Sequence, residues 1–375
     1  MTSDPGPDVR PARPPALLFG IPIDDLTMDE TVELLGEFVR RGRADGRGHQ
    51  LATVNVDFLV NALGDRSITE ILQRADACLA DGMPIVWGSS LLGMPLAERV
   101  AGSDLVPRLF DESQRTGWRV HVFGSSPDVA ARARELIAER YPDARVSIDP
   151  GPMITDVAEI GDEVLDSIAE VDPDILCVAL GNPKQELFIR AHRDRLRVPV
   201  MIGVGGSVDM LVGERRRAPG WVQRVGLEWV ARAVQEPKRL GRRYAHDIRV
   251  MVPRFASEWR AHRRRRRHGG LSIAIGPDEV DVEPTGPPQP DDGAYAAAAS
   301  AIAHGASLRI HAVDGPALPD PAAARLVGLV GLARRADRPV IWEGDPAAVR
   351  LRVEQLGIAP SMLACSEQWR PEHPA

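Results

Sequence analysis

Cysteine, aromatic residues and long apolar runs are all scarce in this chain of 375 residues. Its three cysteines, Cys78, Cys177 and Cys365, are widely spaced and form no CxxC pair, so neither a disulfide framework nor a zinc site is expected. Such cysteine usage is typical of the reducing cytosol, and Cys177, inside an apolar run, is predicted to be a small core residue. No apolar run reaches the roughly 18 residues that a membrane-spanning helix needs.

The beginning of the chain also lacks an apolar segment. Residues 1–15 are rich in Pro, Asp and Arg, so we expect a disordered tail there and no signal peptide. A full GxGxxG fingerprint with a downstream acidic residue is missing too, which argues against a nucleotide-dependent dehydrogenase. The hydrophobic content of 44% is ample for a buried core.

Charge is distributed unevenly along the chain. The formal net charge is −7, yet residues 214–268 hold seventeen Lys and Arg against five Asp and Glu. A basic block of this strength predicts an anionic partner, such as phosphate groups or acidic lipid. Nucleic acid is not the expected partner, because no nucleic-acid-binding motif is evident. The five arginines at 263–267 are the least specific part, since a solvated linker explains them as well as acidic lipid does.

Strand and helix patterns alternate through the first two thirds of the chain. Apolar runs predict strands at 51–56, 118–123, 145–148, 175–180 and 198–204, and helical spacing predicts helices at 27–41, 68–77, 127–140, 158–170 and 184–195. Thr27 and Glu30 predict a capping box at the first helix. This alternation predicts an α/β fold, a Rossmann-like parallel sheet with helices on both faces.

Changes in composition divide the chain into segments. After the tail at 1–15 we expect an α/β domain at 16–220, a basic helical appendage at 221–261, an Arg- and Gly-rich linker at 262–270, a smaller α/β domain at 271–360 and a tail at 361–375. The smaller domain is predicted to hold strands at 271–275, 308–313 and 339–343, and helices at 295–303, 321–335 and 346–356.

One turn carries an unusual density of polar side chains. The sequence Ala179-Leu180-Gly181-Asn182-Pro183-Lys184-Gln185-Glu186 follows a predicted buried strand, and its glycine and proline force a sharp turn into a helix. In an open α/β sheet this is the carboxyl edge, where ligands bind. Asn182, Lys184 and Gln185 are therefore candidate binding residues, because a purely structural loop would not need them all.

Asp81 sits in a second turn, Ala-Asp-Gly-Met-Pro, directly after an apolar stretch. A carboxylate there can take a proton from an attacking hydroxyl if partial burial raises its pKa, although a simple turn or cap aspartate fits the sequence too. Thr53 and Asn55 alternate along a strand, so they face the same side. They suit hydrogen bonding to a sugar, or else cross-strand pairing or an Asx turn.

Two glycine-containing turns also follow predicted strands. Gly124 and Ser125 open a helix, whose free amides can bind phosphate, although a plain turn explains them equally well. Gly205 and Gly206 allow a ligand to approach the backbone closely. Asp209 beside them suits a ribose hydroxyl, or it is merely solvated.

Arginines and tryptophans alternate in the basic block. Arg217 and Arg239 suit a pyrophosphate, where they would offset negative charge growing on a leaving group. Trp221 and Trp229 suit a lipid interface. A solvated helical face with two core tryptophans is the alternative.

Taken together, six ordered blocks resemble the WecG/TagA/CpsF glycosyltransferase family across roughly residues 19–247. The blocks are Thr53-Val54-Asn55, then Ala80-Asp81-Gly82 with 99–104, then 181–186, 203–209, Arg217-Ala218-Pro219 with Leu227-Glu228-Trp229, and Glu236-Pro237-Lys238-Arg239. The resemblance implies an inverting enzyme that uses no metal or cofactor. It would move an N-acetylhexosamine, typically N-acetylmannosamine, from a UDP-sugar to a polyprenyl-diphosphate-linked sugar at the cytoplasmic face of the membrane.

The resemblance also implies roles for single residues. Asp81 would be the general base, acting with Gln185. Thr53, Asn55, Arg99 and Gln185 would hold the donor and acceptor sugars, the glycine loop and Asp209 would contact the nucleotide, and the basic tail would pack over the site and touch the membrane. The segment with Pro84 and Trp87 departs from the family pattern, which leaves the acceptor's identity open.

Residues 271–357 resemble a STAS domain, which supports an interaction or regulatory role with a protein partner. The likeness rests on 308–313, Asp320-Pro321-Ala322 and 345–350. Pro321 stands where signalling members carry a phosphorylatable serine, so no phosphoswitch is expected there. This fusion motivates an alternative function, a non-catalytic sugar-nucleotide-binding or STAS-type regulatory module.

Overall fold

The computed structural model describes residues 13–152, 156–157, 160–213, 237–265, 270–285, 292–312, 318 and 320–344, without side chains at some ends of these ranges. Arg217 and the helix predicted at 346–356 lie outside the described residues, and of Arg239 only the backbone is described. Within the described part of the chain, no helix is both long enough and apolar enough to cross a membrane.

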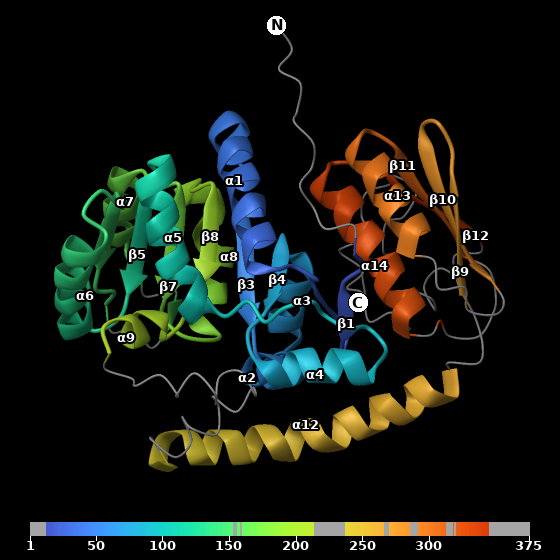
Figure 1. The fold of residues 1–375 in the computed structure, drawn as a ribbon, viewed down its shortest axis with the longest axis horizontal. Helices are drawn as coiled ribbons and strands as arrows, with labels where there is room; N and C mark the ends of the chain where they lie inside the picture. Colours follow the sequence, from blue (N-terminus) through green and yellow to red (C-terminus); the bar gives the residue numbers. More distant parts are fainter. Residues whose placement is uncertain are drawn as a thin grey trace, which may run out of the picture.

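A six-stranded parallel sheet forms the centre of the larger unit (Figure 1). From edge to edge the strands are β4 (Ala77–Ala80), β3 (His49–Val54), β8 (Val200–Gly203), β7 (Ile175–Ala179), β5 (Val120–Gly124) and β6 (Val146–Asp149). Every neighbouring pair is parallel. The predicted α/β fold with a Rossmann-like parallel sheet is therefore confirmed.

Helices cover both faces of this sheet. Alternate residues of β7 point to opposite sides, so Ile175 and Cys177 belong to one core cluster while Leu176 and Val178 belong to another. The first side is covered by α1 (Met28–Asp45), α5 (Gly102–Thr116) and α6 (Pro127–Arg140), and the second by α7 (Asp162–Val171) and α8 (Lys184–Leu196). The predicted core position of Cys177 is confirmed.

The N-terminus of α1 carries the predicted capping box. Thr27 Oγ1 accepts a hydrogen bond from the Glu30 backbone N–H, and the Glu30 carboxylate accepts one from the Thr27 N–H. Two of the four N–H groups left over at a helix start are satisfied in this way.

The strand order places a ligand crevice near β3. The chain moves outwards from β3 to β4, and the later strands fill the opposite side of β3, ending with β8 as its neighbour. Such a reversal of direction opens a crevice outside the carboxyl ends of the strands. The turns after β3, β4, β7 and β8 therefore converge on one region.

The sequence patterns did not predict several elements. They are the hairpin β1 (Ala16–Leu18) and β2 (Ile21–Ile23), the strands β4 and β10 (Glu279–Thr285), and the helices α4 (Met83–Leu91) and α9 (Ser207–Leu211). Three-residue strands are too short to show a period. Pro84 lies in the first turn of α4, where its missing N–H leaves no helical bond unmade. The helices α2 (Val56–Gly64) and α3 (Arg66–Arg74) connect β3 to β4.

A long helix, α12 (Pro237–Arg265), runs below the larger unit towards the C-terminal one (Figure 1). It continues through residues 262–265, which the sequence analysis assigned to a linker. Arginine favours helices, and no glycine or proline intervenes before Gly269, so nothing in the sequence ends the helix at residue 261.

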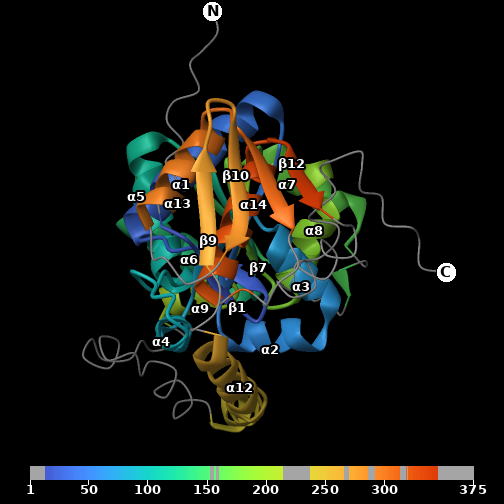
Figure 2. The same ribbon diagram turned by 90° about the vertical axis from the view of Figure 1, so that its right-hand side faces the viewer.

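The C-terminal unit, residues 270–344, is a second α/β layer structure. Its sheet has the order β12 (Val340–Gly344), β11 (Ser307–Ala312), β10 (Glu279–Thr285) and β9 (Gly270–Ile275), parallel except for the antiparallel pair β9–β10. The helices α13 (Asp292–Ala303) and α14 (Asp320–Arg335) lie behind this sheet, towards the larger unit (Figure 2). One core cluster spans both units, because α14 packs on the β1–β2 hairpin.

Candidate functional site

Two hollows meet at the carboxyl edge of the large sheet. A polar hollow of about 350 Å³ lies over the ends of β3, β7 and β8, and an apolar cavity of about 320 Å³ lies between α2, α4 and α12. Asn55, Asp57, Asp81 and Arg243 line both of them. The two hollows therefore adjoin at these four side chains.

The polar hollow collects many of the predicted binding residues. It is lined by residues of several separate turns, among them Thr53, Asn55, Asp81, Asn182, Gln185, Gly205, Gly206 and Asp209. Residues 81 and 185 thus face one shared hollow, as an active site built on both of them requires. A hollow of this size and polarity suits the hydroxyl and phosphate groups of a nucleotide sugar.

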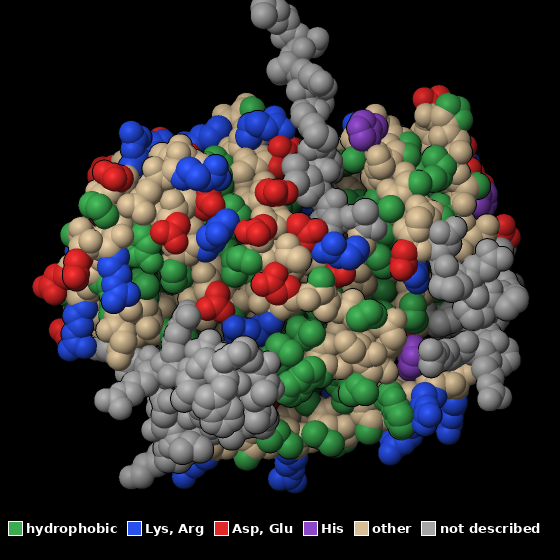
Figure 3. All heavy atoms as spheres, viewed as in Figure 1, with side chains coloured by type: hydrophobic (Ala, Val, Ile, Leu, Met, Phe, Trp, Pro, Cys, Tyr) green, Lys and Arg blue, Asp and Glu red, His purple; other side chains and the backbone are tan. Residues whose placement is uncertain are grey.

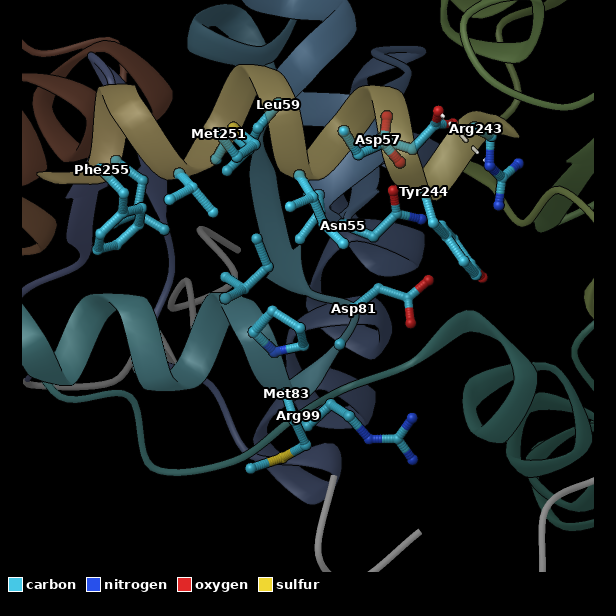
Figure 4. Close-up of a pocket in the computed structure, with 18 residues that line it drawn as sticks. Asn55, Asp57, Leu59, Asp81, Met83, Arg99, Arg243, Tyr244, Met251 and Phe255 are labelled. Carbon is cyan, nitrogen blue, oxygen red and sulfur yellow. Dashed lines mark ion pairs between the residues drawn. The ribbon is translucent and has the colours of Figure 1, made fainter. Parts of the chain in front are cut away.

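Aliphatic and aromatic side chains form the other cavity. Leu18, Leu59 and Ile85 come from β1, α2 and α4, while Met251 and Phe255 come from α12. In Figure 4, Phe255 lies at one end of the cavity and Arg243 at the other, with Asp81 nearer to Arg243. The lining of the cavity is therefore apolar at the Phe255 end, where it suits an apolar chain, and becomes polar towards Asp81.

The position of Asp81 follows from the end of β4. Its backbone N–H donates to the Val54 carbonyl at 2.9 Å, which continues the pairing of β4 with β3. Gly82, with φ +134°, then turns the chain into α4 and is itself the N-cap residue. Asp81 is therefore not the cap of α4, and its carboxylate stands where the polar hollow joins the apolar cavity.

Gln185 is buried and ties two turns together. Its Oε1 accepts a hydrogen bond from the Gly205 N–H at 2.8 Å, and its Nε2 donates to Glu186 Oε1 at 2.8 Å. The amide thus holds the glycine loop after β8 against the turn after β7. Gln185 lines the polar hollow, and the described contacts make it a residue that positions Gly205.

Glu186 supports Gln185 from inside the core. Burial raises the pKa of Glu186 to about 8, with the Gln185 hydrogen bond opposing the shift. A carboxyl group in this state is mostly neutral at pH 7. Gly203 makes room for the pair, because a Cβ at this position would overlap the Glu186 carboxyl and the Gln185 amide.

The two polar residues at the end of β3 also have structural bonds. Thr53 Oγ1 donates to the Gly203 carbonyl at 2.9 Å and so links β3 to β8. Asn55 caps α2, since its Oδ1 accepts from the Phe58 N–H at 3.1 Å. The cross-strand bond of Thr53 and the Asx-type bond of Asn55, which the sequence left open as alternatives to sugar binding, are thus both present. Both side chains also line the polar hollow.

Asn182 and Lys184 differ although they share a turn. Both polar atoms of the Asn182 side chain are buried without a hydrogen-bond partner among the described residues, and Asn182 lines the polar hollow. Its peptide bond to Pro183 is cis. Lys184 begins α8 and lines neither hollow.

Gly124 and Ser125, like Lys184, line neither hollow. They follow β5, which β7 separates from β8, so they lie one strand further from the crevice. Gly124 is packed tightly, since a Cβ there would lie 2.9 Å from the Ala179 carbonyl carbon.

Arg99 lines the apolar cavity and bonds Asp104 Oδ2 through Nη2 at 2.7 Å. In Figure 4 it lies across the cavity from Asp57 and Arg243, with Asp81 between the two walls. The Arg243 guanidinium forms an ion pair with the Asp57 carboxylate at 3.7 Å. Asp57 and Arg243 were not predicted, because each looks like an ordinary charged residue on a helix.

Among the described residues, no group of three or more His, Cys, Asp or Glu side chains is placed to hold a metal ion. The chain does contain one Asp-x-Asp sequence, Asp172-Pro173-Asp174, just before β7. Both carboxylates bind Arg43 there, at the edge of the sheet opposite to the hollows.

A parallel α/β sheet whose carboxyl edge holds a carboxylate between a polar and an apolar hollow is typical of a group-transfer enzyme. The model of the glycosyl transferase WecG/TagA/CpsF family matches residues 16–266, and the chain belongs to this family. It is thus a hexosyltransferase. The matched segment ends before the C-terminal unit.

Three bacterial relatives carry the name N-acetylglucosaminyldiphosphoundecaprenol N-acetyl-beta-D-mannosaminyltransferase. The protein of Bacillus spizizenii W23 is 31% identical over 218 residues, 58% of this chain and 81% of its own length. That of Bacillus subtilis 168 is 31% identical over 209 residues, 56% and 78% of the two chains. That of Staphylococcus aureus MW2 is 29% identical over 226 residues, 60% and 86%.

Proposed function

We propose that this protein moves an N-acetylhexosamine, by likeness N-acetylmannosamine, from a UDP-sugar to a polyprenyl-diphosphate-linked sugar during the synthesis of a cell-surface polymer. The transfer inverts the anomeric centre and needs no metal. The acceptor named for the relatives supports this proposal. The observation that carries it is the position of Asp81 between a polar hollow and an apolar cavity.

The reaction is a direct displacement. The Asp81 carboxylate takes the proton of an acceptor hydroxyl, whose oxygen attacks the anomeric carbon while UDP leaves from the opposite face. The backbone amide of Gly206, with Arg217 and Arg239, offsets the charge that grows on the diphosphate. Thr53, Asn55 and Asn182 hold sugar hydroxyls, and Asp209 holds the ribose.

The apolar cavity receives the first isoprenoid units of the acceptor, and α12 faces the inner surface of the cell membrane. The exposed apolar side chains Ile248, Val252 and Trp259 of α12 and Trp87 and Leu91 of α4 support this orientation. In Figure 3, hydrophobic and basic side chains lie together along the lower edge, where α12 and α4 run. The protein is thus cytoplasmic and peripherally bound.

The C-terminal unit has a protein partner and a regulatory role, as a STAS-like domain. Its mixed four-stranded sheet, with α13 and α14 on one side, supports this likeness. The partner binds the sheet face or an edge strand, since α14 is occupied by the larger unit.

Replacing Asp81 with Asn tests the role of the general base. We expect turnover to fall roughly 10²- to 10⁴-fold, the usual effect of a lost acid–base group, while the dissociation constant for UDP-sugar stays within about twofold. Asp128→Asn, at an exposed position on α6, is the control and should retain full activity. An equal loss of donor binding and of turnover would assign Asp81 a structural role instead.

Donor and acceptor are identified by incubating the protein with a panel of UDP-sugars and short-chain polyprenyl-diphosphate-linked sugars, followed by mass measurement of the products. Release of UDP that depends on the acceptor supports the enzyme. Binding of UDP-sugar with no release under any combination would favour the non-catalytic alternative.

A further inference from the structure

The carboxylate of Asp247 is buried, faces the apolar cavity and has no hydrogen-bond partner within the described residues. The residue is 3% exposed, and neither Oδ1 nor Oδ2 is hydrogen-bonded to any part of the chain that the structure describes. It lines the apolar cavity from α12. A buried polar group without a partner is costly, so such groups are rare in native proteins unless water or a ligand completes them.

The neighbours of Asp247 on α12 fix its place along the cavity. Arg243 lies one helical turn before it and lines both hollows, while Met251 lies one turn after it and lines only the apolar cavity. Asp247 therefore stands between the reacting edge, marked by Asp81, and the part of the cavity suited to an isoprenoid chain. An acceptor that fills both parts must pass it.

A second carboxylate, that of Asp57 on α2, lines the same cavity and lies close enough to influence Asp247. Burial raises the pKa of Asp247 to about 6, and the charge of Asp57 adds to this shift, while Arg243 and His246 oppose it. Asp57 itself is paired with Arg243 at 3.7 Å. Two carboxylates with one nearby guanidinium form an acidic wall that repels an anionic diphosphate.

The opposite wall carries a guanidinium. Arg99 lies across the cavity from Asp57 and Arg243 (Figure 4), and it also bonds Asp104 Oδ2 at 2.7 Å. A diphosphate therefore finds its favourable side at Arg99, and the side of Asp247 is left for neutral groups that donate hydrogen bonds.

We propose that Asp247 binds a hydroxyl or acetamido N–H of the lipid-linked acceptor sugar, and that the acidic wall formed with Asp57 orients the acceptor's diphosphate towards Arg99. This inference rests on the proposed function, because it assigns a binding group to the acceptor in that reaction. Asp247 thus acts as an acceptor-specificity residue that the sequence alone did not single out.

Steady-state kinetics of Asp247→Leu and Asp247→Asn test the proposal, with a short-chain polyprenyl-diphosphate N-acetylglucosamine as acceptor. A hydrogen bond to a charged group is worth about tenfold to a hundredfold in affinity. We expect the KM for the acceptor to rise by this factor in the Leu variant and less in the Asn variant, which still has an accepting oxygen. The KM for the donor should stay unchanged.

A deoxy acceptor series identifies the bonded group. The wild type should discriminate against one deoxy or deacetamido analogue about tenfold or more, and the Leu variant should treat that analogue and the parent acceptor alike. Ser257→Ala, at an exposed position further along α12, is the control and should behave as wild type.

The pH dependence gives a readout that loss of structure would not mimic. The carboxylate form accepts hydrogen bonds, so the wild-type acceptor KM should fall as pH rises through about 6, and this dependence should vanish in Asp247→Asn. The other titratable or charged groups that face the cavity are Asp57 on α2, Asp81 after β4, Arg99 before α5, and Arg243 and Tyr244 on α12.

Two outcomes separate failure of the inference from failure of the proposed function. If the wild type transfers sugar but both variants keep the wild-type acceptor KM, Asp247 is only solvated and the inference is wrong. If the wild type transfers no sugar from any UDP-sugar in the panel, the proposed function itself fails, and the inference falls with it.

Discussion

At the scale of single residues, Glu186 is a carboxyl group that the fold keeps protonated. It is fully buried and bonded to Gln185, and burial raises its pKa from an ordinary value of 4.5 to about 8. Between these two pH values the folded protein binds one proton more than the unfolded chain does. The free energy of unfolding therefore falls as pH rises through this window, by roughly 1.4 kcal/mol per pH unit from this group.

Glu186→Gln keeps the shape and the accepting oxygen but removes the titration. We expect the variant to match the wild type in melting temperature near pH 5 and to exceed it at pH 8, as measured by calorimetry across the pH range. Glu139→Gln, at an exposed position on α6, should leave the pH profile unchanged. Identical profiles for Glu186→Gln and the wild type would mean that water or relaxation stabilises the charged form.

The sequence predicted the residues of the polar hollow better than those of the apolar cavity. Asp81, Gln185 and Asp209 stand in or just after the turns that follow strands, where polar residues near glycines indicate a ligand edge. Asp247 gave no such signal, because an aspartate inside a basic helix looks solvated until the packing of that helix is known. Gly124 followed the same turn pattern as Gly205, but strand order, which no local pattern reveals, separates it from the crevice.

At the scale of elements, α12 brings both buried and exposed side chains to the apolar cavity. Asp247 and Met251 are buried there, while Ile248 and Val252 also line the cavity but are 50% and 59% exposed. The Arg263 guanidinium lies 4.5 Å from the centre of the Trp259 ring, so the far end of the helix combines a cation with an aromatic surface. Sequence analysis predicted a basic helical appendage, and only the coordinates divide its residues between cavity and surface.

Replacing Ile248 and Val252 with serine tests the membrane orientation. The loss of two partly inserted apolar side chains should reduce binding to vesicles of anionic phospholipid by about tenfold or more, as measured by co-sedimentation. Ile275→Ser is the matched control, because Ile275 is 46% exposed but belongs to β9 of the C-terminal unit. Equal vesicle binding by all three proteins would remove this face of α12 from the membrane contact.

At the scale of the whole molecule, the two units share a core and buried polar contacts. Leu326 and Val330 of α14 belong to the same core cluster as Leu18 and Ile21 of the β1–β2 hairpin. Hydrophobic spacing predicted α14, and changes in composition predicted the two-unit division. Neither predicted this packing, because the sequence of an apolar face does not show which other segment it packs against. His262 near the end of α12 bonds Asp320 at 3.1 Å, which fixes that end of the helix on the C-terminal unit.

Arg334 of α14 is the clearest polar link between the units. Its Nη2 donates to the Arg74 carbonyl at 2.9 Å, at the end of α3. Burial lowers the pKa of Arg334 to about 10, while the nearby Asp76 opposes the shift. Burial by itself would raise the pKa of Asp76. This effect is outweighed by His49, the Gln50 N–H and Arg334, which hold the pKa of the Asp76 carboxyl well below its usual range.

Arg334→Ala should therefore destabilise the whole protein and not the C-terminal unit alone. The buried Asp76 carboxylate, left without its nearby guanidinium, and the unbonded Arg74 carbonyl predict a loss of about 1–3 kcal/mol in the free energy of unfolding. Asp337→Asn is a matched control at the same boundary, because asparagine tolerates the φ of +52° there and the change weakens only the exposed Arg47–Asp337 pair at 3.1 Å, which is worth about 0–1 kcal/mol. Calorimetry should give one cooperative transition that shifts downwards in Arg334→Ala and barely moves in Asp337→Asn. Two separate transitions, with only one of them shifted by Arg334→Ala, would mean that the shared core does not make the two units fold together.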